Sequence, residues 1–458
     1  MRDEDLEAFT GFREPVSTLR PGYVDAGACV PGFVLVLPLC PAWDNAFLDP
    51  DGNRTGAIGR SVLLPDGETL FVVRDVQCLP ICYFQRDPAG VLERWDASTG
   101  ILEASVPLAP FLDGGLVQEM YVNAAADIVY LRVYRGVDPA PAGGQIRGLI
   151  AIDAATMTVL GELDAAEGYP QTLHQLPDGD LILSSRIAGT HLNFPASLLR
   201  VDATLTDVRW RIDSTGYNDP WCCGGNVYLF DGLVIQYLQG RLVVRDQDDG
   251  SVLRTVGPLG SAWGRHDFTR GHDGRFYYTV SGSHGPMLFA TIDSSLSTVL
   301  TQRFTDVTGV KGNTVNTDLG HMVVWTSDHI AALDLERRGE VVWERRVGGE
   351  DLDGAGTIDV TYDPETGGYL WTLFTDASGS PRVELLQPWT GIPLAGSSAT
   401  LARADAELWR AFGDIQVDVD LRRLIIAGAA YELSEEGDLI PEARIVTFHL
   451  GPAPLVRT

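Results

Sequence analysis

Three side chains of the sequence could carry acid–base or group-transfer chemistry. His174 lies in TLHQLPDGDLILSSR, a segment that ends at Arg186, and His266 lies in GRHDFTRGHDGRFYY. A histidine can act as a base or nucleophile because its pKa lies near neutrality. An arginine such as Arg186 can stabilise an anion through charge-assisted hydrogen bonds. The alternative interpretation is that these groups hydrogen-bond strand-end backbone and only support packing.

The cysteines form a second group with possible chemistry. They number six and are Cys29, Cys40, Cys78, Cys82, Cys222 and Cys223. An even number in local pairs predicts disulfides: the first two pairs would close short loops, and the adjacent third pair would close a strained ring. No pair has C-x-x-C spacing, which argues against a metal site, and inert thiols remain the alternative.

Disulfides persist in oxidising compartments, so we expect a secreted, periplasmic or cell-surface protein. The first residues, MRDEDLEAFTGF, lack the basic and then apolar pattern of a signal peptide. We therefore expect the leader to be absent from this sequence.

Two Asp-rich turns could hold calcium, a hard cation that prefers oxygen ligands. One contains Asp49, Asp51 and Asn53, and the other contains Asp351 and Asp353. Neither completes the D-x-[DN]-x-[DN]-G…E loop, which excludes an EF-hand. Plain turns with solvated carboxylates are the alternative.

The elements that must position these side chains form an internal repeat. One half of the unit is a strand, a turn containing Asp, and a second strand, as in RWDASTGILEASV and AIDAATMTVLGEL. The repeat positions are Asp96, Asp153, Asp202, Asp246, Asp293, Asp334 and, in the seventh unit, Gln387. The other half is an Asp-Gly turn between apolar runs, a strong hairpin signal. It occurs in the segments Leu64–Val73, Leu176–Ser185, Phe230–Gln236 and His272–Val280.

Strand pairs that recur every 41 to 57 residues, with almost no helical periodicity, predict an all-β fold. We expect a single closed β-propeller of four-stranded blades, with eight blades favoured and seven as the alternative. A sandwich array or β-helix is less favoured because no Pro/Ser-rich linker separates the units.

The eighth unit, from Trp409 to Leu450, lacks an outer strand. The apolar run GFVLVLPL, residues 32–39, could supply that strand and close the ring, which removes open sheet edges. The sequence thus predicts an N-terminal extension with a ring-closing strand at 1–62 and a propeller at 63–458.

Charge and hydropathy exclude several partners. Asp and Glu number 62 against 34 Lys and Arg, a net charge of −28. Such a balance repels phosphate backbones, so we expect no nucleic-acid partner. The longest apolar stretch is far shorter than the ~20 residues of a membrane-spanning helix, so we expect no membrane span.

The units RWDASTGIL, AIDAATMTVL and ALDLERRGEVVW resemble the repeat of pyrroloquinoline-quinone-type, or quinoprotein-like, propellers. The resemblance extends over most of the chain and implies a Trp that docks on the next blade. Only Trp210 and Trp343 fall near that position, and the repeat Gly is equally irregular.

Quinoprotein alcohol dehydrogenases of this type carry a vicinal disulfide beside their cofactor. Cys222 and Cys223, in DPWCCGGN, look like that element, and Asn226 follows. The resemblance would make these residues a quinone-binding site. The family's calcium-binding carboxylates and catalytic Asp have no recognisable counterpart here, so the quinone is an alternative rather than an expected cofactor.

A second resemblance, over about a third of the chain, is to arylsulfotransferase-type propellers. There a histidine precedes an Asp/Asn-Gly hairpin, as His174 and His266 do here. The resemblance implies that these histidines and Arg186 would accept and stabilise a transferred sulfuryl group.

A regular repeat without a complete catalytic set favours a binding or scaffold module for a protein or glycan partner. Trp221 and Trp389, in loops, could form part of such a face. The alternative is a propeller enzyme, either a quinoprotein oxidoreductase or a histidine-based group transferase.

Overall fold

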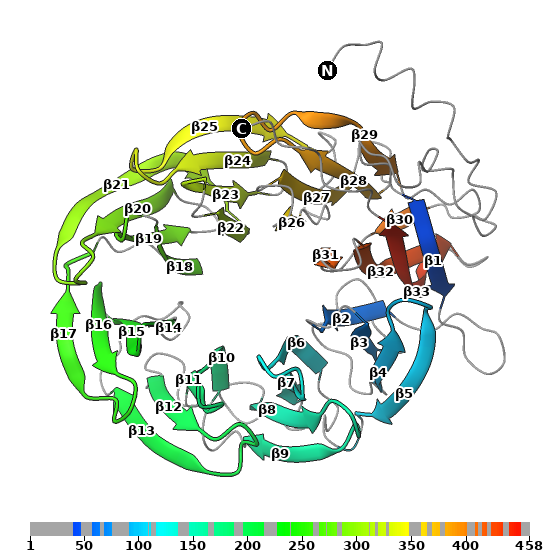
Figure 1. Cartoon of the computed structure of the whole chain (residues 1–458), viewed down its shortest axis with the longest axis horizontal. Coiled ribbons are helices and arrows are strands. Elements are labelled where there is room, and N and C mark those ends of the chain that lie inside the picture. Colours follow the sequence, from blue (N-terminus) through cyan, green and yellow to red (C-terminus); the bar gives the residue numbers. More distant parts are fainter. Residues whose placement is uncertain are drawn as a thin grey trace.

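A ring of β-sheets surrounds a central axis in the computed structural model of this chain (Figure 1). The structure describes residues 40–46, 57–64, 68–75, 91–108, 110, 116–135, 146–163, 169–186, 196–214, 227–238, 240–259, 265–271, 273–281, 286–310, 312–316, 319–326, 329–347, 359–363, 369–375, 381–400, 408–410, 415–418, 423–433 and 439–449. The secondary-structure elements in these ranges are β-strands. The described residues include no helix long and apolar enough to cross a membrane.

Seven antiparallel sheets have four strands each, and we number them as blades 1 to 7 in chain order. Blade 1 contains β2 (Ala57–Leu63), β3 (Thr69–Asp75), β4 (Val91–Asp96) and β5 (Ile101–Pro107). Blade 2 contains β6 (Leu116–Val122), β7 (Ile128–Arg135), β8 (Ile146–Asp153) and β9 (Val159–Leu163). Blade 3 contains β10 (Tyr169–Gln175), β11 (Leu181–Arg186), β12 (Ala196–Val201) and β13 (Val208–Ser214). Blade 4 contains β14 (Val227–Phe230), β15 (Leu233–Leu238), β16 (Arg241–Asp246) and β17 (Val252–Val256).

The same order continues around the ring. Blade 5 contains β18 (Arg265–Arg270), β19 (Phe276–Ser281), β20 (Pro286–Ile292) and β21 (Val299–Thr308). Blade 6 contains β22 (Gly312–Asn316), β23 (His321–Trp325), β24 (His329–Asp334) and β25 (Glu340–Arg346). Blade 7 contains β26 (Asp359–Asp363), β27 (Tyr369–Thr375), β28 (Pro381–Leu386) and β29 (Pro393–Thr400). The predicted half-units are therefore the hairpin of the third and fourth strands of each blade, and the Asp-Gly turns connect first to second strands.

A five-stranded sheet, which we call the closing sheet, completes the ring. It contains β1 (Cys40–Ala46), β30 (Leu408–Arg410), β31 (Ile415–Asp418), β32 (Arg423–Leu433) and β33 (Leu439–His449). The N-terminal β1 pairs antiparallel with β33, so strands from the two ends of the chain close the ring.

The β-propeller and its closure by an N-terminal strand are confirmed, with corrections to the blade count, the closing strand and the start of blade 1. The regular four-stranded blades number seven, the alternative count, because the last sheet has five strands instead of four. The closing strand is Cys40–Ala46 rather than residues 32–39, which lie outside the described residues. Since β2 begins at Ala57, the first blade starts before the expected boundary at residue 63.

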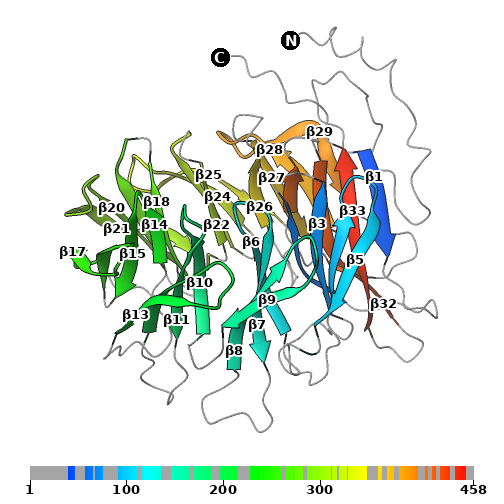
Figure 2. The ribbon, with the colours of Figure 1, turned by 60° about the horizontal axis from the view of Figure 1, so that its bottom comes forward.

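Each blade places its first strand innermost and its fourth strand outermost (Figure 1). Because neighbouring strands are antiparallel, the turns between first and second strands and between third and fourth strands share one end of the blade. We call the side of the ring with these turns the turn face, and the opposite side the loop face. The sheets stand upright around the ring in the tilted view of Figure 2.

Apolar side chains fill the spaces between neighbouring sheets. Blades 1 and 2 share a cluster that includes Phe71 and Leu131, and blades 2 and 3 share one that includes Tyr130 and Leu199. Similar clusters join blades 3 and 4, 4 and 5, 5 and 6, and 6 and 7. Burial between blades is the main source of cohesion, because it removes both faces of each sheet from water.

The turn between third and fourth strands explains why the repeat Gly is irregular. Its left-handed position is occupied by Gly in some blades, but by Met157, Leu205 and Leu296 in others. Their φ angles are 59°, 62° and 54°, and all three side chains are buried. Core burial at these positions compensates for the backbone strain that a non-glycine residue bears there.

Candidate functional site

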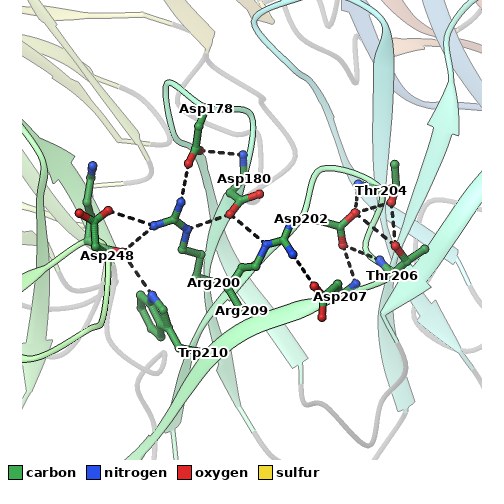
Figure 3. A network of polar contacts seen from close by, with 11 residues as sticks. Asp178, Asp180, Arg200, Asp202, Thr204, Thr206, Asp207, Arg209, Trp210 and Asp248 are labelled. Atoms are coloured by element: carbon green, nitrogen blue, oxygen red, sulfur yellow. Dashed lines mark hydrogen bonds and ion pairs between the residues drawn. The ribbon is translucent and has the colours of Figure 1, made fainter.

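The repeat aspartates stabilise turns, as Asp202 shows most completely (Figure 3). Its Oδ1 accepts hydrogen bonds from the backbone N–H groups of Thr206, at 2.8 Å, and Asp207, at 2.6 Å. Its Oδ2 accepts from the hydroxyl and the N–H group of Thr204. Side chains of this kind stabilise tight turns by satisfying backbone donors. Equivalent bonds are made by Asp96, Asp153, Asp246, Asp293 and Asp334.

The same bonds favour the ionised carboxylate. Burial alone would raise the pKa of Asp202, but hydrogen bonds from Thr204, Asp207 and Thr206 outweigh it and lower the pKa. The pKa of Asp153 is lowered as well, chiefly by the backbone N–H of Thr156. A carboxylate already engaged by several donors of its own turn is held as a structural anion.

Arg200 links the turns of blades 3 and 4 on the turn face (Figure 3). Its Nε donates to Asp180 at 2.9 Å, and its Nη2 pairs with Asp178. From the same guanidinium, Nη1 reaches the carbonyl of Gln247 at 3.3 Å and the carboxylate of Asp248 at 3.2 Å. One mostly covered cation therefore draws three carboxylates from two blades together.

Arg209 extends this network toward the rim of the ring. Its Nε lies 3.4 Å from Asp180 Oδ2, and its Nη1 pairs with Asp207. The carboxylates of Asp178, Asp207 and Asp248 remain largely exposed, whereas Asp180 is mostly covered. The surface is therefore anionic, because these four carboxylates share only two arginines.

Exposed apolar side chains follow two of these carboxylates, Asp207 and Asp248, in the sequence. Val208 directly follows Asp207, and Val252 and Leu253 begin the outer strand of blade 4. All three are exposed. Leu253 is the extra residue of a β-bulge between β16 and β17, and bulges re-aim side chains in this way. We call Asp178, Asp207, Val208, Asp248, Val252 and Leu253 the blade 3–4 surface.

His174, a predicted catalytic residue, lies between two blades. It is the sixth residue of β10, and its ring centroid is 6.4 Å from that of Tyr228 in blade 4. Burial lowers its pKa, and a hydrogen bond to the backbone carbonyl of Val227 opposes that shift only partly. The structure therefore places the imidazole in a contact between blades 3 and 4, where burial favours its neutral form.

Protonation of His174 is expected to destabilise the fold as the pH falls. Its pKa in the folded state lies below the value of about 6.5 for the unfolded chain, so the unfolded state takes up the proton first. The contribution of His174 to the free energy of unfolding should be constant above pH 7 and should fall, by up to about 1.4 kcal/mol per pH unit, from about pH 6.5 down to its pKa in the folded state.

Urea titrations between pH 5 and 8 measure this slope. The part due to His174 should vanish in His174→Gln and persist in His329→Gln, which alters a histidine of blade 6. Parallel pH profiles for wild type and His174→Gln would contradict the assignment.

The structure does not bring the three predicted catalytic residues together. Arg186 pairs with Tyr169 at the loop-face end of blade 3, whereas His174 pairs with Ile182 near its turn-face end. His266 pairs with Val280 near the loop-face end of β18, in blade 5. His174 thus lies near the turn face, whereas Arg186 and His266 lie near the loop face.

The remaining predicted site residues lie mostly outside the described residues. These are Cys222, Cys223 and Asn226 of the quinone alternative, Asp49, Asp51, Asn53, Asp351 and Asp353 of the calcium alternative, and Cys29, Cys78 and Cys82. Cys40 is described as the first residue of β1, opposite His449. In the described ranges, no three His, Cys, Asp or Glu side chains are grouped as a metal site.

Trp210 and Trp343 are the inter-blade docking residues that the repeat predicted. The indole N–H of Trp210 donates to the carbonyl of Gln247 at 3.2 Å, and that of Trp343 donates to the carbonyl of Pro388 at 2.7 Å. Each acceptor is the residue directly after the repeat position of the next blade.

Other junctions use donors that the repeat pattern missed. The guanidinium of Arg94 donates to the carbonyl of Ala154 at 2.9 Å, and the hydroxyl of Tyr130 donates to that of Ala203 at 2.9 Å. Both acceptors again follow a repeat aspartate, but neither donor lies on the fourth strand of its blade. Arg94 lies on the third strand of blade 1, and Tyr130 lies on the second strand of blade 2. The repeat pattern predicts donors on the fourth strand only, so it does not reveal these two.

The ring of sheets and the turn-to-blade contacts define this chain as a β-propeller. Among solved structures it is similar to the C-terminal WD40 domain of Sif2, at 10% identity and a TM-score of 0.55, covering 90% of this chain and 99% of that one. It is also similar to the Dos1 propeller, at 12% identity and a TM-score of 0.55, covering 90% and 95%.

A third similar structure is the dihydro-heme d1 dehydrogenase NirN in complex with DHE, at 15% identity and a TM-score of 0.52, covering 85% of this chain and 77% of that one. At these identities the likeness concerns the fold alone. No protein-family description and no curated protein sequence matches the chain.

Proposed function

We propose that this protein is a binding scaffold whose blade 3–4 surface docks a positively charged protein surface. The observation that carries the proposal is the convergence of exposed carboxylates from two blades on Arg200, on outer strands that also expose Val208, Val252 and Leu253. The WD40 domain of Sif2 and the Dos1 propeller, among the similar structures, are consistent with a scaffold.

The charge of the surface determines the kind of partner. Asp178, Asp207 and Asp248 extend from turns held rigid by Arg200 and Arg209, so little side-chain entropy is lost on binding. Complementary potentials accelerate encounter and suppress wrong partners. An overall charge of −28 adds a long-range attraction for a basic protein.

The apolar side chains favour a protein over a glycan. Protein interfaces combine an apolar centre with a polar rim, as Val252 and Leu253 do with the neighbouring carboxylates. A sugar would be expected to stack on an exposed aromatic face. The one aromatic residue of the described network, Trp210, is docked on blade 4 instead.

The proposal is tested by affinity capture from the native source, with Asp207→Lys and Asp248→Lys combined in one variant. Bound protein should decrease at least tenfold relative to wild type, and binding should weaken as salt is raised from 50 to 300 mM, since salt screens exposed charges. The matched control combines Glu336→Lys and Glu340→Lys in blade 6, and it should bind like wild type. Equal capture by all three would assign binding to another surface, and no capture by wild type would contradict the scaffold function.

A second proposal concerns compartment and chemistry. We propose a secreted, periplasmic or surface protein with disulfides, and we retain calcium binding and a propeller enzyme as alternatives to a pure scaffold. The cysteine pairs and Asp-rich turns of the sequence support this. Mass spectrometry of natively purified, unreduced protein would detect disulfides, a quinone and calcium together. Six free thiols would contradict the compartment.

A further inference from the structure

The outer strand of blade 5 carries two buried hydrogen-bond donors that have no acceptor. One is the hydroxyl group of Thr305, a residue of β21 that is 4% exposed. The other is the Nε–H group of Arg303 on the same strand. The two residues are separated by exposed Phe304, so their side chains lie on the same face of β21. Burying such donors costs free energy unless an acceptor meets them.

Residue pairing shows that this face of β21 is directed toward blade 6. Arg303 pairs with Phe289 on the neighbouring strand β20. Directly paired residues of antiparallel strands lie on the same face of the sheet. Phe289 packs in the apolar cluster that joins blades 5 and 6, and Ala331 of blade 6 belongs to the same cluster. The donors of Arg303 and Thr305 therefore lie on the side of blade 5 that faces blade 6.

The next junction around the ring shows how such an arginine is neutralised. Arg345 of blade 6 has the position of Arg303, because each pairs with the fourth residue before the repeat position of its blade. Arg345 lies 2.6 Å from a carboxylate oxygen of Glu384 in blade 7. Glu384 is the third residue before the repeat position, and the corresponding residue of blade 6 is Ala331. The junction between blades 5 and 6 thus has the cation but not the carboxylate.

No other group in the described part of the chain replaces that carboxylate, since the Arg303 guanidinium forms no hydrogen bond or ion pair there. Arg245 of blade 4 also has a buried Nε–H without a partner, but its Nη1 donates to the carbonyl of Gly250 at 2.9 Å. Glu344, on the outer strand of blade 6, is 59% exposed and lies 3.9 Å from Nε2 of His329.

We propose that a small monovalent anion, with chloride as the simplest case, binds between blades 5 and 6 in place of the missing carboxylate. The Nε–H of Arg303 and the hydroxyl of Thr305 donate to it, and its single negative charge balances one guanidinium. Phe289 and Ala331 beside the site are buried, which excludes a bulky and strongly hydrated anion such as phosphate.

Urea denaturation of the full-length chain at pH 7 and constant ionic strength tests this proposal. Replacing sodium gluconate by sodium chloride at about 300 mM should lower the unfolding equilibrium constant about fivefold, as expected for a dissociation constant of about 75 mM. Gluconate is the matched salt because it has the same charge and is too large for the site. Equal unfolding constants in the two salts would leave the donors to water and overturn the proposal.

Three variants locate the bound ion. Arg303→Met should abolish the difference between the two salts, because no cation is left to neutralise. Ala331→Glu should also abolish it, because it supplies the carboxylate that Glu384 supplies at the next junction. The control Arg254→Met removes an exposed arginine of blade 4 and should keep the fivefold difference. If Arg303→Met keeps that difference too, chloride acts elsewhere and the proposal is wrong.

Bromide-soaked crystals give a readout that does not depend on any variant. Bromide replaces chloride and scatters anomalously, so the proposal requires an anomalous peak within hydrogen-bond distance of Arg303 Nε and Thr305 Oγ1. The absence of a peak at this place, with peaks elsewhere on the surface, would contradict the site.

Discussion

Replacement of Trp343 by alanine is expected to lower the free energy of unfolding by about 3–5 kcal/mol, the usual range for a buried Trp. Trp343 is 8% exposed and spans the junction between blades 6 and 7. Its ring packs on the turn of blade 7, where a Cβ on Gly391 would come within 2.5 Å of it. Its N–H is also the donor to the buried Pro388 carbonyl. Chemical denaturation would measure the loss.

Two further variants separate the contributions at this junction. Trp343→Phe keeps an aromatic ring but removes the N–H donor and part of the indole, so it should cost less than Trp343→Ala, about 1–3 kcal/mol. Trp210→Ala, at the equivalent but more exposed position of blade 3, should cost less than Trp343→Ala. Equal stability of Trp343→Ala and wild type would show that the docking contact contributes nothing.

Gly391 forms the other side of the contact with Trp343, and Gly320 is its matched control. Both adopt left-handed backbone, with φ angles of 65° and 66°, but only a Cβ at Gly391 meets another side chain. Gly320→Ala should therefore cost about 1 kcal/mol, the conformational penalty alone. Gly391→Ala should cost clearly more, and the excess should disappear in the Trp343→Ala background.

Glu384→Gln is expected to lower the free energy of unfolding by about 1–3 kcal/mol, because it removes the negative charge of a buried carboxylate that accepts charge-assisted bonds from two partly exposed arginines. Glu384 lies on β28 of blade 7 and is 2% exposed. Arg345, from β25 of blade 6, approaches its Oε2 at 2.6 Å, and Arg382 donates to its Oε1 at 2.8 Å. The pair therefore joins two blades. Urea denaturation at pH 7 gives the change.

The control uses the same charge change at an exposed place nearby. Glu344 adjoins Arg345 in sequence but is largely exposed, so Glu344→Gln should change stability by less than about 0.5 kcal/mol. The double variant Arg345→Met with Glu384→Leu should recover much of the loss, because an apolar pair needs no counter-charge. If Glu384→Gln and Glu344→Gln behave alike, the ion pair has no structural role.

Local sequence was sufficient to predict the hairpins of the repeat. Asp96, Asp153 and Asp202 were predicted to mark turns, and each accepts bonds from the next few residues. Such bonds depend on residues within about five positions, so spacing along the chain reveals them. The Asp-Gly turns between first and second strands were predictable for the same reason.

Closure of the ring was predictable only in outline. An unpaired outer edge required a strand from the N-terminus, but hydropathy pointed to residues 32–39 instead of Cys40–Ala46. Register is set by pairing with β33, a contact across nearly the whole chain. The local apolar content of a segment carries no information about such a partner.

The candidate sites show the same limit. His174 and Arg186 are close in sequence and share blade 3, yet antiparallel pairing places them at opposite ends of it. The blade 3–4 surface was not recognised in advance, because Asp178, Asp207 and Asp248 come from three separate turns. An excess of acidic residues around them was the only sequence signal.

The all-β class, the period of the repeat, the turn-capping aspartates and the need for a closing strand could be predicted from the sequence alone. These features follow from side-chain alternation and from hydrogen bonds within single turns. The tertiary structure decided the identity of the closing strand, the donors Arg94 and Tyr130, the inter-blade position of His174 and the blade 3–4 surface. Each of these depends on which segments meet when the ring closes, and such contacts leave no regular spacing in the chain.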